Sequence, residues 1–96
     1  MGVVFDVFYH ELVVKKDIPV IAPNERTIIK KIIEEKLTFR PEVFGKPLRY
    51  SLRGYRKLRV GDWRVIFRIE KNKVKIFYIG HRSGAYREAQ KRLAAE

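Results

Sequence analysis

Residues 54–69 read GYRKLRVGDWRVIFRI, and their pattern is the clearest structural signal in the chain. On both sides of Gly61-Asp62, apolar and basic residues alternate with a period of two, which is typical of strands with one buried face. A Gly-Asp pair between two such runs favours a tight turn. We therefore expect two antiparallel strands, at residues 55–60 and 63–69.

A third strand is expected at residues 73–79, KVKIFYI. The short turn before it contains Lys71 and Asn72, and asparagine tolerates the left-handed backbone region. Three strands joined by two tight turns make an antiparallel meander. Its apolar face needs a packing partner. Its other face is predicted to carry four cations together, Lys57, Arg59, Arg64 and Arg68.

The clearest helix is predicted at residues 24–37, where five apolar residues form one stripe. These residues are Ile28, Ile29, Ile32, Ile33 and Leu37. Asn24 is the expected N-cap of this helix.

Weaker patterns surround it. They predict a strand at residues 3–8 that is buried on both faces, a short helix at 9–17 that ends before Pro19, and a last helix at about 85–95. The predicted order is β-α-α-β-β-β-α. This is one small α+β domain over residues 1–96, with the antiparallel meander packed against two N-terminal helices and followed by a C-terminal helix.

Charge is distributed unevenly along the chain. Its net charge is +11, with 8 basic and 7 acidic residues in 1–48 but 14 basic and 4 acidic residues in 49–96. Because the excess positive charge is concentrated in residues 49–96, we expect a surface there that binds a polyanion. A solvated, ion-rich surface is the structural alternative.

Several classes of protein are disfavoured. The chain has no cysteine and two histidines, so neither a disulfide framework nor a metal site is expected, and no cofactor is predicted. It shows no signal peptide and no apolar run long enough to span a membrane, which favours the cytoplasm. P-loop, G-x-S-x-G and H-E-x-x-H patterns are absent from the sequence.

The residues that could carry chemistry follow the strands. His81 and Arg82 end the third strand and Tyr86 opens the last helix, so an imidazole, a phenol and the sheet cations could converge. Such groups suit RNA cleavage by the ribose 2′-OH, which needs a base, an acid and cations for the developing charge. Each of these residues could equally have a structural role.

The run 54–69, together with Lys46-Pro47-Leu48 and Ile79-Gly80-His81-Arg82, closely resembles the RelE/ParE superfamily of toxins from type II toxin–antitoxin systems. The resemblance extends over nearly the whole chain. For RelE-like members it implies an endoribonuclease that cuts mRNA in the ribosomal A site and inhibits translation.

Carried over to this chain, the family's functional positions fall on five residues, Lys57, Arg59, Arg64, Arg82 and Tyr86, with Arg56 as a further RNA contact. Arg68, which shares the predicted cationic face, is also expected to contact RNA. The sheet motif contains no glutamate, so the general base stays open among Lys57, His81 and Tyr86.

The resemblance also implies partners. They are a partly disordered antitoxin that is acidic where it wraps the toxin, the mRNA and ribosome, and DNA only through the antitoxin. ParE-type members poison DNA gyrase instead, which is the alternative function. A basic RNA-binding module without catalysis is a third.

Overall fold

The alternating residues of the meander form the centre of the fold. The computed structural model describes residues 4–96, and in it the meander consists of three antiparallel strands. They are β3 (Arg56–Val60), β4 (Trp63–Glu70) and β5 (Lys73–His81). The predicted meander is therefore confirmed, with every strand end within two residues of its expected position.

The two turns of the meander both use a left-handed residue. Gly61, between β3 and β4, has φ 58°, a conformation that glycine adopts without a steric penalty. In the second turn it is Lys71, with φ 56°, that takes this conformation. The prediction that Asn72 does so was wrong.

An irregularity in β5 changes which side chains share a face. Ile66 pairs with Tyr78, but the next residue, Phe67, pairs with Ile76, so Phe77 is an extra residue in β5. Such a bulge breaks the strict alternation of a strand. Phe77 packs in the same cluster as Ile66 and Tyr78, on the side of the sheet that the C-terminal helix covers.

Residues 4–96 contain two further strands at the edges, giving a five-stranded sheet in the order β1-β5-β4-β3-β2. β1 (Asp6–Tyr9) pairs parallel with β5, so the sheet is mixed. β1 has a partner on one side only and its residues alternate in exposure, which corrects the prediction of a strand buried on both faces. Val3, the predicted start of this strand, lies outside the described residues. β2 (Lys46–Pro47) pairs antiparallel with β3.

The long helix α1 spans Pro23–Leu37. It begins with proline at its first position, where the missing N–H is not needed, and Ala22 precedes it. Asn24 therefore lies inside the helix and is not the cap. Ile29, Ile33 and Leu37 of the predicted stripe are buried, whereas Ile28 is 53% exposed.

The other helices are short, apart from α3. Residues 9–17 were predicted to form one helix, but β1 includes Tyr9 and two short helical turns follow, at Val13–Asp17 and Ile18–Val20. Pro19 lies inside the second turn rather than ending the helical region. Two helical elements were not predicted, α2 (Pro41–Phe44) and a 3₁₀ turn at Tyr50–Leu52, and neither was the short strand β2. The C-terminal helix α3 (Ala85–Ala95) was predicted with the same bounds. None of the helices in the described part of the chain is long and apolar enough to cross a membrane.

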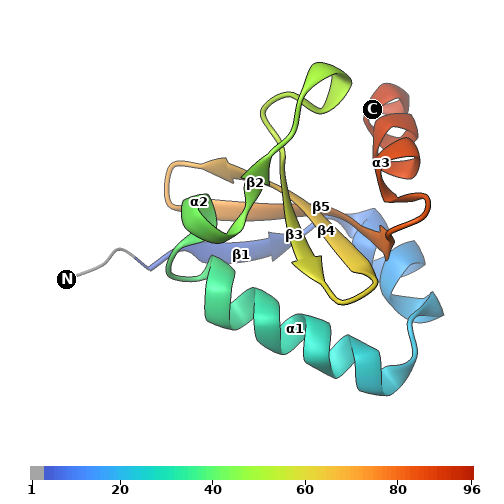
Figure 1. Cartoon of the computed structure of the whole chain (residues 1–96), viewed down its shortest axis with the longest axis horizontal. Coiled ribbons are helices and arrows are strands. Elements are labelled where there is room, and N and C mark those ends of the chain that lie inside the picture. Colours follow the sequence, from blue (N-terminus) through green and yellow to red (C-terminus); the bar gives the residue numbers. More distant parts are fainter. Residues whose placement is uncertain (1–3) are drawn as a thin grey trace.

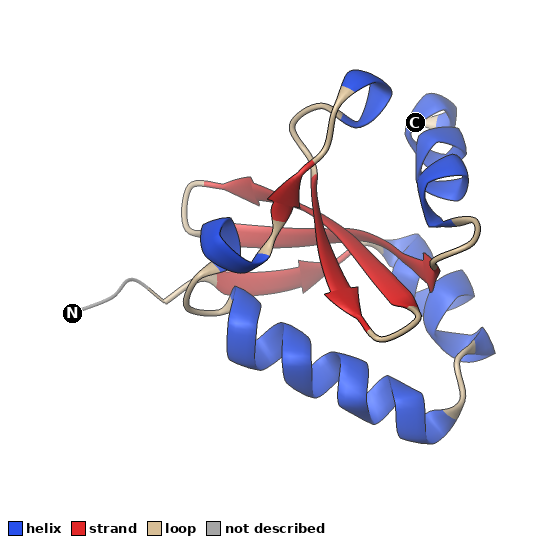
Figure 2. Ribbon diagram, viewed as in Figure 1, coloured by secondary structure: helices blue, strands red, loops and turns tan. Residues whose placement is uncertain are grey.

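The sheet is covered on both faces (Figures 1 and 2). α1 packs on one face, where Ile33 and Leu37 join Val65 and Phe67 in the larger core. On the other face, α3 and the segment before β3 bury a smaller core. Its buried members are Leu52, Tyr55, Ile66, Phe77 and Ala89. The face that the sequence predicted to be cationic and otherwise free is thus partly covered by α3.

A buried ion pair fixes α3 against the rest of the protein. The guanidinium of Arg92 donates two hydrogen bonds of 2.8 Å to the carboxylate of Asp17 and a third, of 2.9 Å, to the Phe77 carbonyl. Asp17 also accepts the backbone N–H of Ile79 at 3.0 Å. Arg92 stacks on Tyr78, 4.8 Å from its ring centre. Since both charges are almost completely buried and joined by two parallel hydrogen bonds, this pair fixes the position of α3 on the sheet.

Candidate nucleic-acid interface

We call the side of the sheet that carries Lys57, Arg59 and Arg64 the basic face. Lys57 and Arg59 project there because they alternate along β3 with Leu58 and Val60, which are buried in the larger core. Arg64 is directly opposite Arg59 in the register, and residues in that relation share a face.

Lys57 lies beside the first turn of α3. Its ammonium nitrogen is 5.4 Å from the centre of the Tyr86 ring, a cation–π contact between β3 and α3. The two side chains line one end of a cavity of about 270 Å³. Its other lining residues are Leu48, Arg49, Tyr50, Leu52 and Gln90. An ammonium and a phenol therefore face the same open space.

Arg59 and Arg64 form a pair of opposed cations near the β3–β4 turn. Arg59 is exposed, while Arg64 is 9% exposed and donates from Nη1 to the carbonyls of Gly61 and Trp63, both at 2.9 Å. These carbonyls hold the guanidinium in place without neutralising its charge. Like charges directly opposite each other are unfavourable, so an anion between them would relieve the repulsion.

Arg82 is attached to the same turn. Its backbone N–H donates to the Asp62 carbonyl at 2.8 Å, and its Nε lies 3.7 Å from Asp62 Oδ1. Both side chains are more than half exposed, so this ion pair is weak and easily exchanged for another anion. Arg59, Arg64 and Arg82 thus gather at the β3–β4 turn.

His81 does not join this group. It is opposite Trp63 in the register, and its ring meets the Trp63 ring edge-on, with 5.9 Å between centroids. Trp63 packs against the larger core, so His81 points away from the basic face. Its Nδ1 lies 2.9 Å from the Ser83 hydroxyl. The expected convergence of the imidazole with the phenol and the sheet cations was wrong.

Two predicted RNA contacts are also placed elsewhere. Arg56 is opposite Phe67 on the α1 side, and its Nη1 donates to the Gly45 carbonyl at 2.9 Å, which supports the end of α2. Arg68 shares the basic face but lies four residues further along β4 than Arg64, about 13 Å away. There it pairs with Glu70 and stacks on Tyr55.

The rim of the cavity contains a residue that sequence reasoning missed. Tyr50 is 89% exposed, and its φ of 57° is unusual for a bulky side chain. Strained backbone of this kind gathers at functional sites. The sequence gives no signal for it, because residues 49–53 have no regular period.

Comparisons with known proteins agree on one family. A family model described as the ParE toxin of type II toxin–antitoxin systems matches residues 14–86. The curated protein Toxin RelE of Mycobacterium tuberculosis is 43% identical over 49 residues, which are 49% of this chain and 50% of that protein. The chain therefore matches about half the length of this curated relative.

Solved structures show the same fold. The toxin–antitoxin complex RelBE2 from Mycobacterium tuberculosis contains a chain that matches with a TM-score of 0.78 and 26% identity, covering 84% of this chain and 94% of that one. A mutant of the Escherichia coli toxin RelE in the free state matches with a TM-score of 0.65 and 20% identity, covering 94% and 98%. The predicted α+β fold class is confirmed, and the second likeness concerns the fold alone.

Proposed function

Because the chain belongs to the family of ParE toxins of type II toxin–antitoxin systems, we propose that it is the toxin of such a pair and acts as an endoribonuclease on mRNA. The observation that carries the proposal is the position of Lys57 beside Tyr86, on the same face as the opposed pair Arg59 and Arg64. Groups that exchange protons and groups that bind phosphate then lie on one face.

The proposed reaction uses the RNA's own hydroxyl. The ribose 2′-oxygen attacks the adjacent phosphorus, its proton passes to a base, and the bond from phosphorus to the 5′-oxygen breaks as that oxygen is protonated. The products are a 2′,3′-cyclic phosphate and a free 5′-hydroxyl. Because the attack requires a 2′-OH, the activity is specific to RNA.

Each residue of the basic face has a proposed role. Arg59, Arg64 and Arg82 bind the phosphate and stabilise the charge that develops on its oxygens. Proton transfer falls to Lys57 and Tyr86, since His81, the third candidate, projects to the other side of the sheet.

The proposed substrate is mRNA on the ribosome. The resemblance to RelE-like toxins and the similarity to a protein named Toxin RelE support this choice. The alternative, inhibition of DNA gyrase, is supported by the description of the matching family model. A basic RNA-binding module without catalysis is the third possibility.

Expression of the chain without a partner separates these functions. We expect growth arrest in which incorporation of labelled amino acids stops before incorporation of thymidine. Early loss of thymidine incorporation with intact translation would favour gyrase inhibition. In a translating lysate, primer extension should map new 5′ ends within coding sequence. If the folded protein produces no such ends, the ribonuclease proposal is wrong.

The proposed partner is an antitoxin that is acidic at the contact surface. Residues 49–96 have a net charge of +10, and the solved relative RelBE2 is a toxin–antitoxin complex. A partly disordered antitoxin that folds on this surface would neutralise the charge, and the complex would contact DNA through the antitoxin. Co-purification from the native operon should recover a small acidic protein, and failure to recover one would argue against the pairing.

A further inference from the structure

A second group of aromatic and cationic side chains lies at the other end of the sheet. It forms a row across neighbouring strands, with Phe8 of β1 opposite Lys75 of β5, and Lys75 opposite Arg68 of β4. The guanidinium of Arg68 then lies over Tyr55, 5.7 Å from its ring centre. We call these four residues the distal row. It has two cations in the middle and an aromatic ring at each end.

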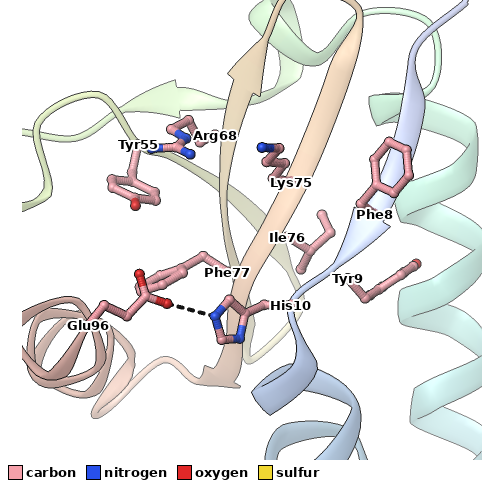
Figure 3. A pocket seen from close by; sticks show the side chains of 9 residues that line it. All are labelled: Phe8, Tyr9, His10, Tyr55, Arg68, Lys75, Ile76, Phe77 and Glu96. Atoms are coloured by element: carbon pink, nitrogen blue, oxygen red, sulfur yellow. Dashed lines mark hydrogen bonds and ion pairs between the residues drawn. The ribbon is translucent and has the colours of Figure 1, made fainter.

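The distal row borders a cavity of about 190 Å³ (Figure 3). Phe77 is in its lining and meets two of the surrounding rings, Tyr55 at 5.2 Å and His10 at 5.6 Å between centroids. Figure 3 shows Arg68 and Lys75 on one side of the hollow, and His10 with Glu96 on another. The His10 Nε2 lies 2.7 Å from Glu96 Oε1. The cavity therefore offers aromatic surface, cations and a hydrogen-bonding imidazole–carboxylate pair.

Cations and carboxylates lie side by side around the cavity mouth: Arg68, Lys73 and Lys75 with Asp6, Glu70 and Glu96. Glu70 contacts both Arg68 and Lys75, the latter at 3.3 Å. The hydrogen bond from Lys75, followed by the nearby charges, holds the pKa of Glu70 below its usual range, so this carboxylate is ionised at neutral pH. Glu70 is thus shared by two cations. Lys73 lies between Asp6 of β1 and Glu70 of β4 in the register, and its ammonium is 5.7 Å from the centre of the Phe8 ring.

This combination is the one that single-stranded nucleic acids require. Bases stack on aromatic rings whatever their identity, and phosphates bind the cations between them. Phe8 is 48% exposed although it is aromatic; Lys75 lies directly opposite it on the neighbouring strand, and the Lys73 ammonium reaches its ring from the position opposite Asp6. We propose that the distal row and its cavity form a second nucleotide-binding site, which takes one nucleotide of single-stranded RNA.

In this site the phosphate lies against Lys75 and Arg68, with Lys73 at the mouth. The base enters beside the exposed ring of Phe8, over the buried rings of Phe77 and Tyr55, and its polar edge meets His10 and Glu96. The site lies about 13 Å along β4 from Arg64, so it is separate from the basic residues at the β3–β4 turn. It goes beyond the proposed function, because it requires RNA binding and no cleavage.

The test measures binding of a fluorescent single-stranded decamer with 2′-O-methyl riboses, which cannot undergo attack by the 2′-oxygen. The double variant Lys73→Ala/Lys75→Ala should weaken binding about tenfold or more. It should also lower the slope of log Kd against log salt by about 0.7, because the site holds one phosphate and each phosphate contact of a single strand contributes about 0.7. The control is Lys30→Ala/Lys31→Ala, which removes two exposed cations from α1 and should leave the Kd and the slope unchanged.

A cross-linking measurement locates the RNA on the folded wild-type protein. With 5-iodouridine in the decamer, we expect cross-links in peptides that contain Phe8 or Tyr55, and their loss in Phe8→Ala. Wild-type affinity in the Lys73→Ala/Lys75→Ala variant, or cross-links confined to residues 49–54 and Tyr86, would overturn the proposal. The proposal would also be overturned if the Lys73→Ala/Lys75→Ala variant lost binding to an acidic protein partner while its RNA binding stayed unchanged.

The outcomes distinguish this site from the proposed cleavage. A wild type that binds RNA at the distal row but cuts no mRNA would contradict the ribonuclease proposal and support this one. A wild type that cuts mRNA, with the lysine variants binding RNA normally, would support cleavage and overturn the distal site.

Discussion

The ammonium of Lys57 lies against the ring of Tyr86, so the central meander and the C-terminal helix contribute one side chain each to a single contact. Neither residue is fully buried, and both face the 270 Å³ cavity. A contact between two separate elements depends on how those elements are packed. The chemistry proposed for this face is therefore sensitive both to the two side chains and to whatever positions α3.

Tyr86→Phe removes the phenolic oxygen and keeps the ring beside Lys57. If the phenol exchanges a proton during cleavage, the rate should fall about 10²–10⁴-fold without loss of stability. Single-turnover cleavage of mRNA in a translating lysate measures this. Lys91→Ala, an exposed cation on α3 that pairs with Glu88, is the matched control and should cleave normally. Wild-type cleavage by Tyr86→Phe would remove Tyr86 from the mechanism.

Arg82→Ala should reduce cleavage about 10²–10³-fold while RNA binding survives, because a group that stabilises the transition state adds little to ground-state affinity. Its side chain is 60% exposed, so the melting temperature should change little. Parallel loss of binding and cleavage would instead indicate a simple phosphate contact.

Arg64→Ala should have the same effect on cleavage, but it also leaves two turn carbonyls without their donor. Circular dichroism must first show that this variant folds. If folded Arg64→Ala and Arg82→Ala both cleave at the wild-type rate, the assignment of the basic face is wrong.

Asp17→Asn breaks the buried pair with Arg92. Removing one partner of such a pair leaves the other charge buried and unpaired, and we expect a loss of about 3–5 kcal/mol in the free energy of unfolding. Urea denaturation measures it. Glu11→Gln, in an exposed pair with Lys15, is the control and should cost less than about 1 kcal/mol. A double variant Asp17→Asn/Arg92→Leu should be more stable than the sum of the single losses predicts. Additive losses would mean that the two residues are not coupled.

Tyr9→Phe should stabilise the protein by up to about 1 kcal/mol. The Tyr9 hydroxyl is buried and has no hydrogen-bond partner among residues 4–96, so removing it relieves a desolvation penalty. Thermal unfolding at pH 7 measures the change. A clear drop in the melting temperature would show that the hydroxyl makes a stabilising contact.

The same residue gives a dependence on pH. Burial, and then the negative charge of Glu34, raise the pKa of Tyr9 above its usual value near 10. The unfolded chain therefore loses this proton first, and stability falls as pH rises above 10 until the folded pKa is passed. Tyr9→Phe should lose less stability between pH 9.5 and 11 than the wild type. Equal losses would contradict the raised pKa.

The local features of the fold could be predicted from the sequence, because each is encoded by neighbouring residues. The period of two in 54–69 and the turn residue Gly61 predict the hairpin, and the apolar stripe of 24–37 predicts α1. The parallel pairing of β1 with β5 has no such local signal. The pairing of Asp17 with Arg92 has no local signal either, because the sequence does not distinguish a buried aspartate from an exposed one until its partner is known.

The residues of the basic face could likewise be placed only where a local pattern shows which side of the sheet they face. The alternation of β3 and β4 correctly placed Lys57, Arg59 and Arg64 on one face. His81 was misplaced although the signal was available, because it is two residues after Ile79, which is buried in the larger core. Arg56 is two residues before the buried Leu58, so the alternation along β3 could have placed it on the α1 side in the same way. The distal row could not be foreseen, because it depends on β1 lying beside β5.

The pairing of Asp17 with Arg92 also bears on the order in which this domain assembles during its synthesis. The two residues are 75 positions apart, so their contact closes a loop of most of the chain. Closing so long a loop has a large entropic penalty, and contacts of this separation slow folding. A nascent chain that ends before Arg92 would have to bury the Asp17 carboxylate alone, which is strongly unfavourable. Since Tyr86 belongs to the same helix as Arg92, the contact between Lys57 and Tyr86 also lacks this support until Arg92 has been added and has paired with Asp17.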